Sequence, residues 1–453
     1  MGGAAQFLCS RGHAPMSALS LSGLLAGQMW LASAISAGIV LTLVVRVRSW
    51  GMELGSAGSQ HIHVAPTSRL GGAAIFLGFV VAVAIALQLE LMPLRPALPL
   101  LIAALPVQAV GLWEDITHRV SPRHRLLAAV FSAAVAGAIA QGVIARLDLP
   151  FVDGWVAYLP FAVPLTCFMV AGACNAFNII DGNHGLAGGS ALLMFVGVAI
   201  VAWDAGDTSV LGQAAAMTGA LVGFLLWNYP KGKVFLGDAG AYFIGFMYAQ
   251  LSIQLVARNA GVSAWFVIAL AAYPIFETLF SIYRRKIVLH TAAMQPDIRH
   301  LHSLLYLYFL RSAERLPSEE RRLGLVLGQY PGRERRQPQR RANARVAPHL
   351  WLHGALCFAT ALAFYGNTPV LIGFTLIYGI YYWACYRDAE RLSGDNTMAR
   401  RTIPSASAWA SVKHRWSDWG ASSVLRSLIS NALAKACLRS WQLVIRKGVL
   451  PRQ

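Results

Sequence analysis

Polar side chains interrupt two long apolar runs in the stretch N-A-F-N-I-I-D-G-N-H-G-L-A-G-G, residues 175–189. Asn178 and Asp181 are three positions apart, which places their side chains on one side of a helical turn. Amide and carboxylate oxygens are the ligand types that a hard cation such as Mg²⁺ prefers. The alternative is a polar turn between two helices, because Asn, Asp and Gly are the usual turn residues. Taken alone, the stretch favours neither interpretation.

A further acid stands among glycines. Asp238 lies in L-G-D-A-G, near Gly237 and Gly240, so a ligand can approach its carboxylate without steric crowding. With Asn178 and Asp181 it predicts an oxygen-rich site suited to Mg²⁺, which takes few protein ligands and completes its shell with water and substrate phosphates. A helix N-cap is the other common role of Asp at a helix start, but it does not account for glycines on both sides.

Two adjacent acids, Glu114 and Asp115, end another apolar run. Neighbouring carboxylates raise each other's pKa, so one of them suits a general base or a metal-supporting group. Arginines follow at positions 119, 123 and 125, and the alternative is therefore a solvated charge cluster beside the membrane. We favour the functional interpretation, because carboxylates at a helix end near lipid are costly without a partner.

Basic residues complete a predicted phosphate site. Cations neutralise a pyrophosphate and stabilise the charge that develops during phosphoryl transfer. Taken singly, each histidine is more often a surface residue, and each lysine or arginine is more often explained by the basic inner loops of membrane proteins. The candidates are Arg69, Lys231, Lys233, Arg285, Arg299, His300 and His302.

Composition places the chain in a membrane. Of its 453 residues, 56% are hydrophobic and only 13% are charged, and the mean hydropathy is +0.53, which excludes a soluble domain of this length. The net charge of +18 is explained by inner loops and anionic headgroups, and we expect no nucleic-acid partner. The six cysteines form no C-x-x-C pair, so we interpret them as packing residues.

The apolar runs predict an all-α polytopic membrane protein with about 10–11 transmembrane helices. Connections that follow odd-numbered spans share one face of the membrane, and they hold most of the Lys and Arg, so this face is cytoplasmic. They also hold nearly every polar segment above, which predicts an active site formed by cytoplasmic loops. The predicted spans are 18–45, 70–89, 97–113, 126–144, 156–173, 186–203, 210–227, 236–256, 262–283, 350–365 and 369–386.

With these residues in place, the chain resembles the polyprenyl-phosphate N-acetylhexosamine-1-phosphate transferase superfamily, glycosyltransferase family 4, from about His61 to Tyr306. The stretch at 175–189 and the motif F-L-G-D-A-G carry most of the resemblance. P-T-S-R-L-G-G resembles the early cytoplasmic motif of the family, with Arg69 as its cation. The chain is most similar to the bacterial branch that starts lipopolysaccharide O-antigen or related cell-envelope glycans.

The resemblance implies a magnesium-dependent phosphotransferase, with Mn²⁺ as an alternative metal. Such enzymes move an N-acetylated amino-sugar 1-phosphate from a UDP-sugar to undecaprenyl phosphate and release UMP. Asn178 and Asp238 match the metal ligands, and Glu114 and Asp115 match the catalytic acids. The other matched residues would bind substrate: Arg69, Asn175, Asp181, His184, Lys231, Arg285, Arg299, His300 and His302.

Two departures from the family pattern leave questions open. The family often has two aspartates where this chain has Glu114 and Asp115, so which acid acts as the base is not decided. His184 stands where many members have Asp or Asn, and donor recognition can differ accordingly. The donor sugar is therefore open among N-acetylglucosamine, N-acetylgalactosamine and a 6-deoxy amino sugar.

The predicted organisation is a catalytic membrane core at 1–310, a basic cytoplasmic excursion, mostly loop, at 311–349, two further spans at 350–386 and a basic tail at 387–453 that could lie on the inner leaflet. We expect a multi-pass protein of the bacterial inner membrane, surrounded by membrane lipids, with its active site on the cytoplasmic face. The oligomeric state is open and includes a homodimer.

A transporter or lipid flippase is the rival function. It would place paired charges near mid-membrane in broken helices, whereas the predicted spans are apolar at their centres and the polar groups gather at one rim. A nonenzymatic scaffold would not need Asn178, Asp181 and Asp238 together with adjacent acids.

Overall fold

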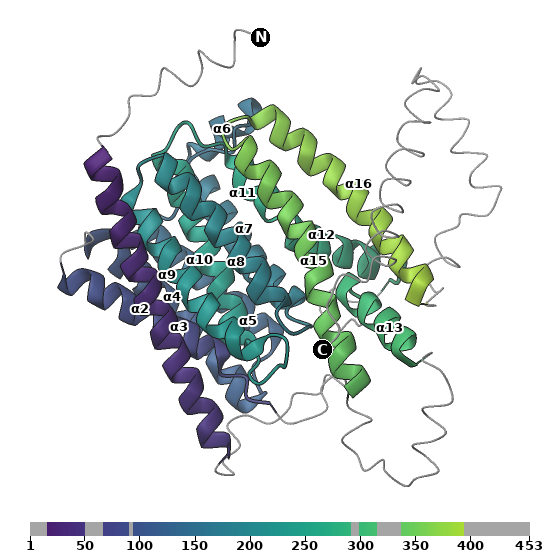
Figure 1. The fold of residues 1–453 in the computed structure, drawn as a ribbon. Coiled ribbons are helices and arrows are strands. Elements are labelled where there is room, and N and C mark those ends of the chain that lie inside the picture. Colours follow the sequence, from purple (N-terminus) through teal and green to yellow (C-terminus); the bar gives the residue numbers. More distant parts are fainter. Residues whose placement is uncertain (1–15, 50–66, 90–93, 291–298, 315–336, 394–453) are drawn as a thin grey trace, which may run out of the picture.

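The computed structural model describes residues 16–49, 67–89, 94–290, 299–314 and 337–393, and these residues form helices without a strand (Figure 1). An all-α polytopic architecture is thereby confirmed. The helices are α2 (Met16–Ser49), α3 (Gly71–Gln88), α4 (Leu94–Thr117), α5 (Pro122–Ile139), α6 (Pro150–Val156), α7 (Leu159–Ile180), α8 (Leu186–Asp204), α9 (Thr208–Asn228), α10 (Gly237–Arg258), α11 (Ala264–Leu270), α12 (Ala272–Tyr283), α13 (Leu301–Glu314), α15 (Gln337–Ala363) and α16 (Thr368–Ser393), with a π-helical turn, η1 (Arg284–Val288), after α12.

Nine of the described helices are long and apolar enough to cross a membrane, and the pair α11–α12, bent by 73°, makes a tenth. The predicted span at 126–144 corresponds to α5, which is not among them because its first turn is basic. It still runs the full length of α10. Arg125 at its start pairs with Asp238 at the N-terminus of α10, and Arg146 beyond its end donates to the carbonyl of Val256, 3.2 Å away, at the other end of α10. Helix α5 therefore connects the two ends of the bundle, as the predicted span at 126–144 requires.

Helix α10 lies at the centre of the bundle. Within its candidate span 89% of the residues are buried, against 24% for α2 at the periphery, and α10 packs on α3, α4, α7 and α8 (Figure 1). The polar N-terminus of α10 therefore sits in the middle of one end of the bundle, where side chains from several helices can reach it.

Glycines let three backbones touch at this end. A Cβ atom on Gly72 of α3 would lie 2.0 Å from the amide nitrogen of Gly240, and one on Gly111 of α4 would lie 2.5 Å from Cα of Ala239. Such distances are far below van der Waals contact, so any larger residue would push α3 or α4 away from α10. The glycines thus fix the positions of the polar residues that follow.

The C-terminal helices are longer than predicted. Helix α15 begins at Gln337 and α16 ends at Ser393, beyond the predicted boundaries at 350 and 386. Helix α15 packs on α13, and the described part of the predicted loop at 311–349 is helix. The remainder of that segment, 315–336, and the tail after residue 393 lie outside the described residues.

Candidate active site

Asp238, in the first turn of α10, is the centre of the polar cluster. Its carboxylate accepts a hydrogen bond from Nδ2 of Asn178 on α7, 2.7 Å away, and forms an ion pair with Arg125, which lies in the first turn of α5. Nη2 of Arg69, which precedes α3, lies 3.6 Å from the same carboxylate. Residues predicted from separate connections therefore meet at one point at the end of the bundle.

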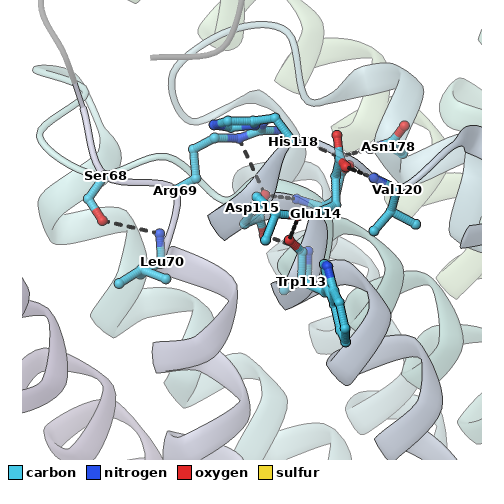
Figure 2. A network of polar contacts seen from close by, with 12 residues as sticks. Ser68, Arg69, Leu70, Trp113, Glu114, Asp115, His118, Val120 and Asn178 are labelled. Carbon is cyan, nitrogen blue, oxygen red and sulfur yellow. Dashed lines mark hydrogen bonds and ion pairs between the residues drawn. The ribbon is translucent and has the colours of Figure 1, made fainter. Parts of the chain in front are cut away.

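Asp115 caps α10 from a neighbouring helix. Its fully buried carboxylate accepts the backbone N–H of Asp238 at 2.8 Å and that of Ala239 at 2.9 Å, which are among the amide groups that a helix N-terminus leaves unpaired. Arg69 closes the arrangement, with Nε 3.3 Å from the carboxylate (Figure 2). Gly237 makes the approach possible: its φ is +75°, and a Cβ atom there would lie 2.5 Å from Oδ2 of Asp115. The N-cap role considered for Asp238 is thus filled by Asp115.

Glu114 differs from its neighbour. Its side chain is partly exposed, and Oε2 accepts the backbone N–H of Val120 at 2.7 Å, which closes the turn after α4 (Figure 2). Of the two acids, Asp115 has both oxygens committed to the start of α10, whereas the side chain of Glu114 remains partly exposed.

Asp181 brings a third carboxylate to the centre. It lies at the C-terminus of α7 and accepts the backbone N–H of Gly237. Burial raises the pKa of Asp181 well above its usual range; Arg69 opposes this, and the carboxylates of Asp238 and Asp115 add to it. Three acidic side chains thus lie near the two arginines at positions 69 and 125, and a bound cation would relieve the repulsion between these acids and favour their ionised forms.

The donor set fits Mg²⁺. Within the part of the chain that the structure describes, no three His, Cys, Asp or Glu side chains are grouped as a complete metal cage. Mg²⁺ does not require one, because it commonly binds one or two carboxylates and takes its other ligands from water and substrate phosphates. Asp238 and Asn178 are in contact through Nδ2 of the amide, and each carries an oxygen of the hard kind that Mg²⁺ binds; Asp181 lies beside them.

His184 is buried beside α15. Its backbone N–H donates to Oδ1 of Asn343 on α15 at 2.8 Å, and its ring packs on Phe235, with 5.6 Å between ring centroids. Burial lowers the pKa of His184 to about 4, so the ring is uncharged at neutral pH. The structure therefore places this predicted substrate ligand inside the packing between α15 and the loop before α10.

His300 and His302 form a second polar group. Their rings are parallel, with centroids 5.3 Å apart and 5° between planes. His302 packs against Gly182, where a Cβ atom would lie 2.2 Å from its Nε2. The late histidines therefore adjoin the loop that carries Asp181.

The other predicted ligands are more dispersed. Asn175 is partly buried on α7, one turn before Asn178, and Lys231 is exposed. Arg285 lies in η1, while the carbonyl of Arg299 accepts the hydroxyl of Tyr386 at 3.0 Å. The contacts of the Asp238 side chain are instead with Arg69, Arg125 and Asn178.

Comparison with known proteins shows which family the central region of the chain resembles. Residues 97–256, which include Asp115, Asn178 and Asp238, match the family model described as glycosyl transferase family 4. A probable undecaprenyl-phosphate N-acetylglucosaminyl 1-phosphate transferase of Bacillus subtilis is 26% identical over 290 residues, which are 62% of this chain and 77% of that protein. The candidate site therefore lies largely within a region that is similar to glycosyl transferase family 4.

Two other relatives extend the comparison. A decaprenyl-phosphate N-acetylglucosaminephosphotransferase of Mycobacterium tuberculosis is 29% identical over 290 residues, covering 57% of this chain and 71% of that protein. An undecaprenyl-phosphate alpha-N-acetylglucosaminyl 1-phosphate transferase of Salmonella typhi is 32% identical over 178 residues, covering 37% of this chain and 48% of that protein.

Sequence reasoning misses two residues of the candidate site. The sequence suggests a surface charge cluster for Arg125, although this residue pairs with Asp238, 113 positions away. Glu277 is not singled out by any motif, although it is the buried partner of His300, with Nδ1 of the ring 3.0 Å from its carboxylate. A signal for Glu277 is present, because an acid inside an apolar span is expensive unless it has a function.

Proposed function

We propose that this protein transfers an N-acetylated amino-sugar 1-phosphate from a UDP-sugar to undecaprenyl phosphate and releases UMP. The observation that carries the proposal is the convergence of Arg69, Arg125, Asn178 and Asp238 at one end of an apolar bundle. The names of the relatives, which are polyprenyl-phosphate N-acetylglucosamine-1-phosphate transferases, support the same reaction.

The chemistry needs chiefly positioning and charge compensation. An oxygen of the lipid phosphate attacks the phosphorus that carries the sugar, the bond from that phosphorus to the bridging oxygen breaks, and UMP departs with the electron pair. Both reactants are anions, so Arg69 and Arg125 offset their repulsion. Asp115 contributes by holding the first turn of α10, and with it Asp238, in place.

Asp238 and Asn178 would hold Mg²⁺, with Mn²⁺ as an alternative. When bound, the ion neutralises phosphate charge and orients the pyrophosphate. Glu114 is the acid available to keep the acceptor phosphate deprotonated, because it lies at the partly exposed side of the cluster. Asp181 lies beside the proposed metal ligands, where a bound cation would favour its ionised form.

The setting proposed for this reaction is the cytoplasmic face of the bacterial inner membrane. Basic residues are concentrated in the connections at the end that carries the cluster, in agreement with the positive-inside rule. Apolar side chains exposed on the outer helices, such as Leu77, Leu127 and Phe168, suit contact with lipid. The product would begin a cell-envelope polysaccharide, of which an O-antigen is one kind. The comparisons give no support to the transporter alternative.

The test is a transfer assay with the purified full-length chain in mild detergent. Radiolabelled UDP-N-acetylglucosamine, UDP-N-acetylgalactosamine and a 6-deoxy UDP-amino sugar are offered separately with undecaprenyl phosphate. We expect organic-extractable label and stoichiometric UMP from at least one donor, with both lost in EDTA and restored by Mg²⁺.

Asp238→Asn should lower the rate by at least about 100-fold, as the loss of a group that positions phosphate charge does. Asp388→Asn is the matched control, because this aspartate is 41% exposed and pairs only loosely with Arg391, at 3.7 Å. Full activity in the Asp238 variant, or transfer that EDTA does not affect, would contradict the assignment of the site.

A further inference from the structure

Glu277 is a buried acid within the bent span formed by α11 and α12, only 1% exposed. A carboxylate at such a depth is costly unless several donors satisfy it. Three do so here. Oε1 accepts from Nδ1 of His300 at 3.0 Å and from the backbone N–H of Leu301 at 3.2 Å, and Oε2 accepts the hydroxyl of Tyr382 at 2.9 Å. The acid therefore links α12 to the start of α13 and to α16.

This arrangement fixes the proton of one histidine. An ionised carboxylate can only accept hydrogen bonds, so Nδ1 of His300 must carry a proton. The second nitrogen, Nε2, is then the one that can serve a ligand. Because Leu301 donates to the same oxygen, the backbone at the start of α13 and the ring of His300 are held by one atom.

The contacts of His300 extend to the loop after α7, which carries Asp181. The ring of His300 stacks on that of His302, and the ring of His302 lies against Gly182, the residue after Asp181. A series of contacts thus joins the buried Glu277 to the loop that begins at Asp181, the acid beside Asp238. A shift of the His300 ring would be transmitted to that loop through two flat surfaces in van der Waals contact.

We propose that Glu277 is a positioning residue for the transfer reaction, holding His300 in its Nδ1–H form and keeping the stack of two histidines against the loop at Asp181. The inference rests on the proposed function and adds a residue outside the matched region 97–256 to the site. The acid touches neither substrate nor metal; it acts through His300.

The experiment compares Glu277→Ala, Glu277→Gln and a control, Tyr378→Phe, in the full-length chain. Tyr378 lies on α16, one turn before Tyr382, and its buried hydroxyl contacts His353 at 3.3 Å, so the control removes a buried hydroxyl from the same helix. Glutamine keeps an oxygen that can accept from Nδ1 and from Leu301. Steady-state kinetics give KM and kcat for the UDP-sugar. The ¹⁵N imidazole shifts of His300, assigned by difference with His300→Gln, report which nitrogen carries the proton.

We expect Glu277→Ala to lose the Nδ1–H signature and to lower kcat/KM for the donor by about 10–100-fold, as is usual when the partner that orients a functional histidine is removed. Glu277→Gln should restore the Nδ1–H form and most of the activity, and Tyr378→Phe should match the unmodified protein. Should Glu277→Ala fail to purify as a folded protein, Glu277→Asp, shorter by one methylene, should show the same two losses.

The proposal would be overturned if Glu277→Ala kept both the Nδ1–H signature and the kinetics of the unmodified protein. It would also be overturned if Glu277→Gln were as impaired as Glu277→Ala. The two hypotheses are separable. If the unmodified protein transfers no sugar phosphate from any donor, the proposed function fails, whereas the imidazole shifts still report whether Glu277 holds His300.

Discussion

Replacement of Asp115 by alanine tests whether this acid chiefly holds helix α10 in place. The substitution removes two hydrogen bonds, of 2.8 and 2.9 Å, from a carboxylate that is fully buried. Hydrogen bonds to a charged group contribute about 1.5–3 kcal/mol each, so the pair accounts for about 3–6 kcal/mol. A typical domain has a free energy of unfolding of about 5–15 kcal/mol. We therefore expect a large loss of stability.

Equilibrium unfolding in mixed micelles of a mild detergent and SDS gives the required free energies. Asp115→Asn should fall between the alanine variant and the unmodified protein, because the amide keeps one acceptor oxygen but turns an NH₂ group toward a backbone N–H. Glu114→Gln is the control: Glu114 is partly exposed and its amide analogue can still accept from Val120, so we expect a change within about 0.5 kcal/mol. A loss below about 1 kcal/mol in Asp115→Ala would refute the capping argument.

Two further predictions concern contacts away from Asp238. Asn343→Ala removes the acceptor of the buried backbone N–H of His184. An unsatisfied amide costs about 1–3 kcal/mol, so hydrogen exchange at the amide of His184 should accelerate about 5- to 150-fold. Unchanged exchange would show that α15 does not hold this loop. Burial alone would raise the pKa of Asp148, but the N–H of Ala264 and the side chain of Arg146 outweigh it and bring the pKa below 3.8. The stabilisation that ionised Asp148 contributes is therefore fully present above about pH 4 and is lost as the pH falls through the pKa of the folded state. Asp148→Asn should reduce the dependence of the free energy of unfolding on pH below about pH 4. An unchanged dependence would contradict the assignment.

The positions of the main site residues follow from simple features of the sequence. Alternation of sides is enough to place Arg69, Asp115, Asn178 and Asp238 at one end of the bundle, because each ends or begins an apolar run. The alternation of connections between the two membrane faces does not predict which side chains contact each other. That depends on helix rotation and on close backbone contacts such as the one between Gly72 and Gly240.

The acidic pair illustrates this limit. Adjacent carboxylates look equivalent in the sequence, but neighbouring residues on a helix point about 100° apart. One of them, Asp115, therefore turns into the contact with α10, and the other, Glu114, turns toward the turn at Val120. Their separate environments come from packing between α4 and α10, which no local pattern records.

The C-terminal helices are also hard to interpret from sequence. Residues 337–349 are polar and rich in arginine, which is typical of a loop. In the structure Asn343 and Trp351 of α15 bind the backbone of residues 184 and 185, the latter through an indole N–H 3.1 Å from the carbonyl of Gly185. Polar residues of this segment thus contact the stretch at 175–189. A local pattern in residues 337–349 does not show this, because the contact partner is distant in the sequence.

The burial of α10 on nearly all sides bears on how this protein can change over generations. A helix with one face toward lipid accepts apolar exchanges along that face, and its tolerance recurs every three or four residues. With 89% of its span enclosed, α10 has no such permissive stripe, whereas α2 has a broad one. Sequence divergence should therefore accumulate along the rim of the bundle, while its axis drifts only through paired, compensating substitutions in neighbouring helices.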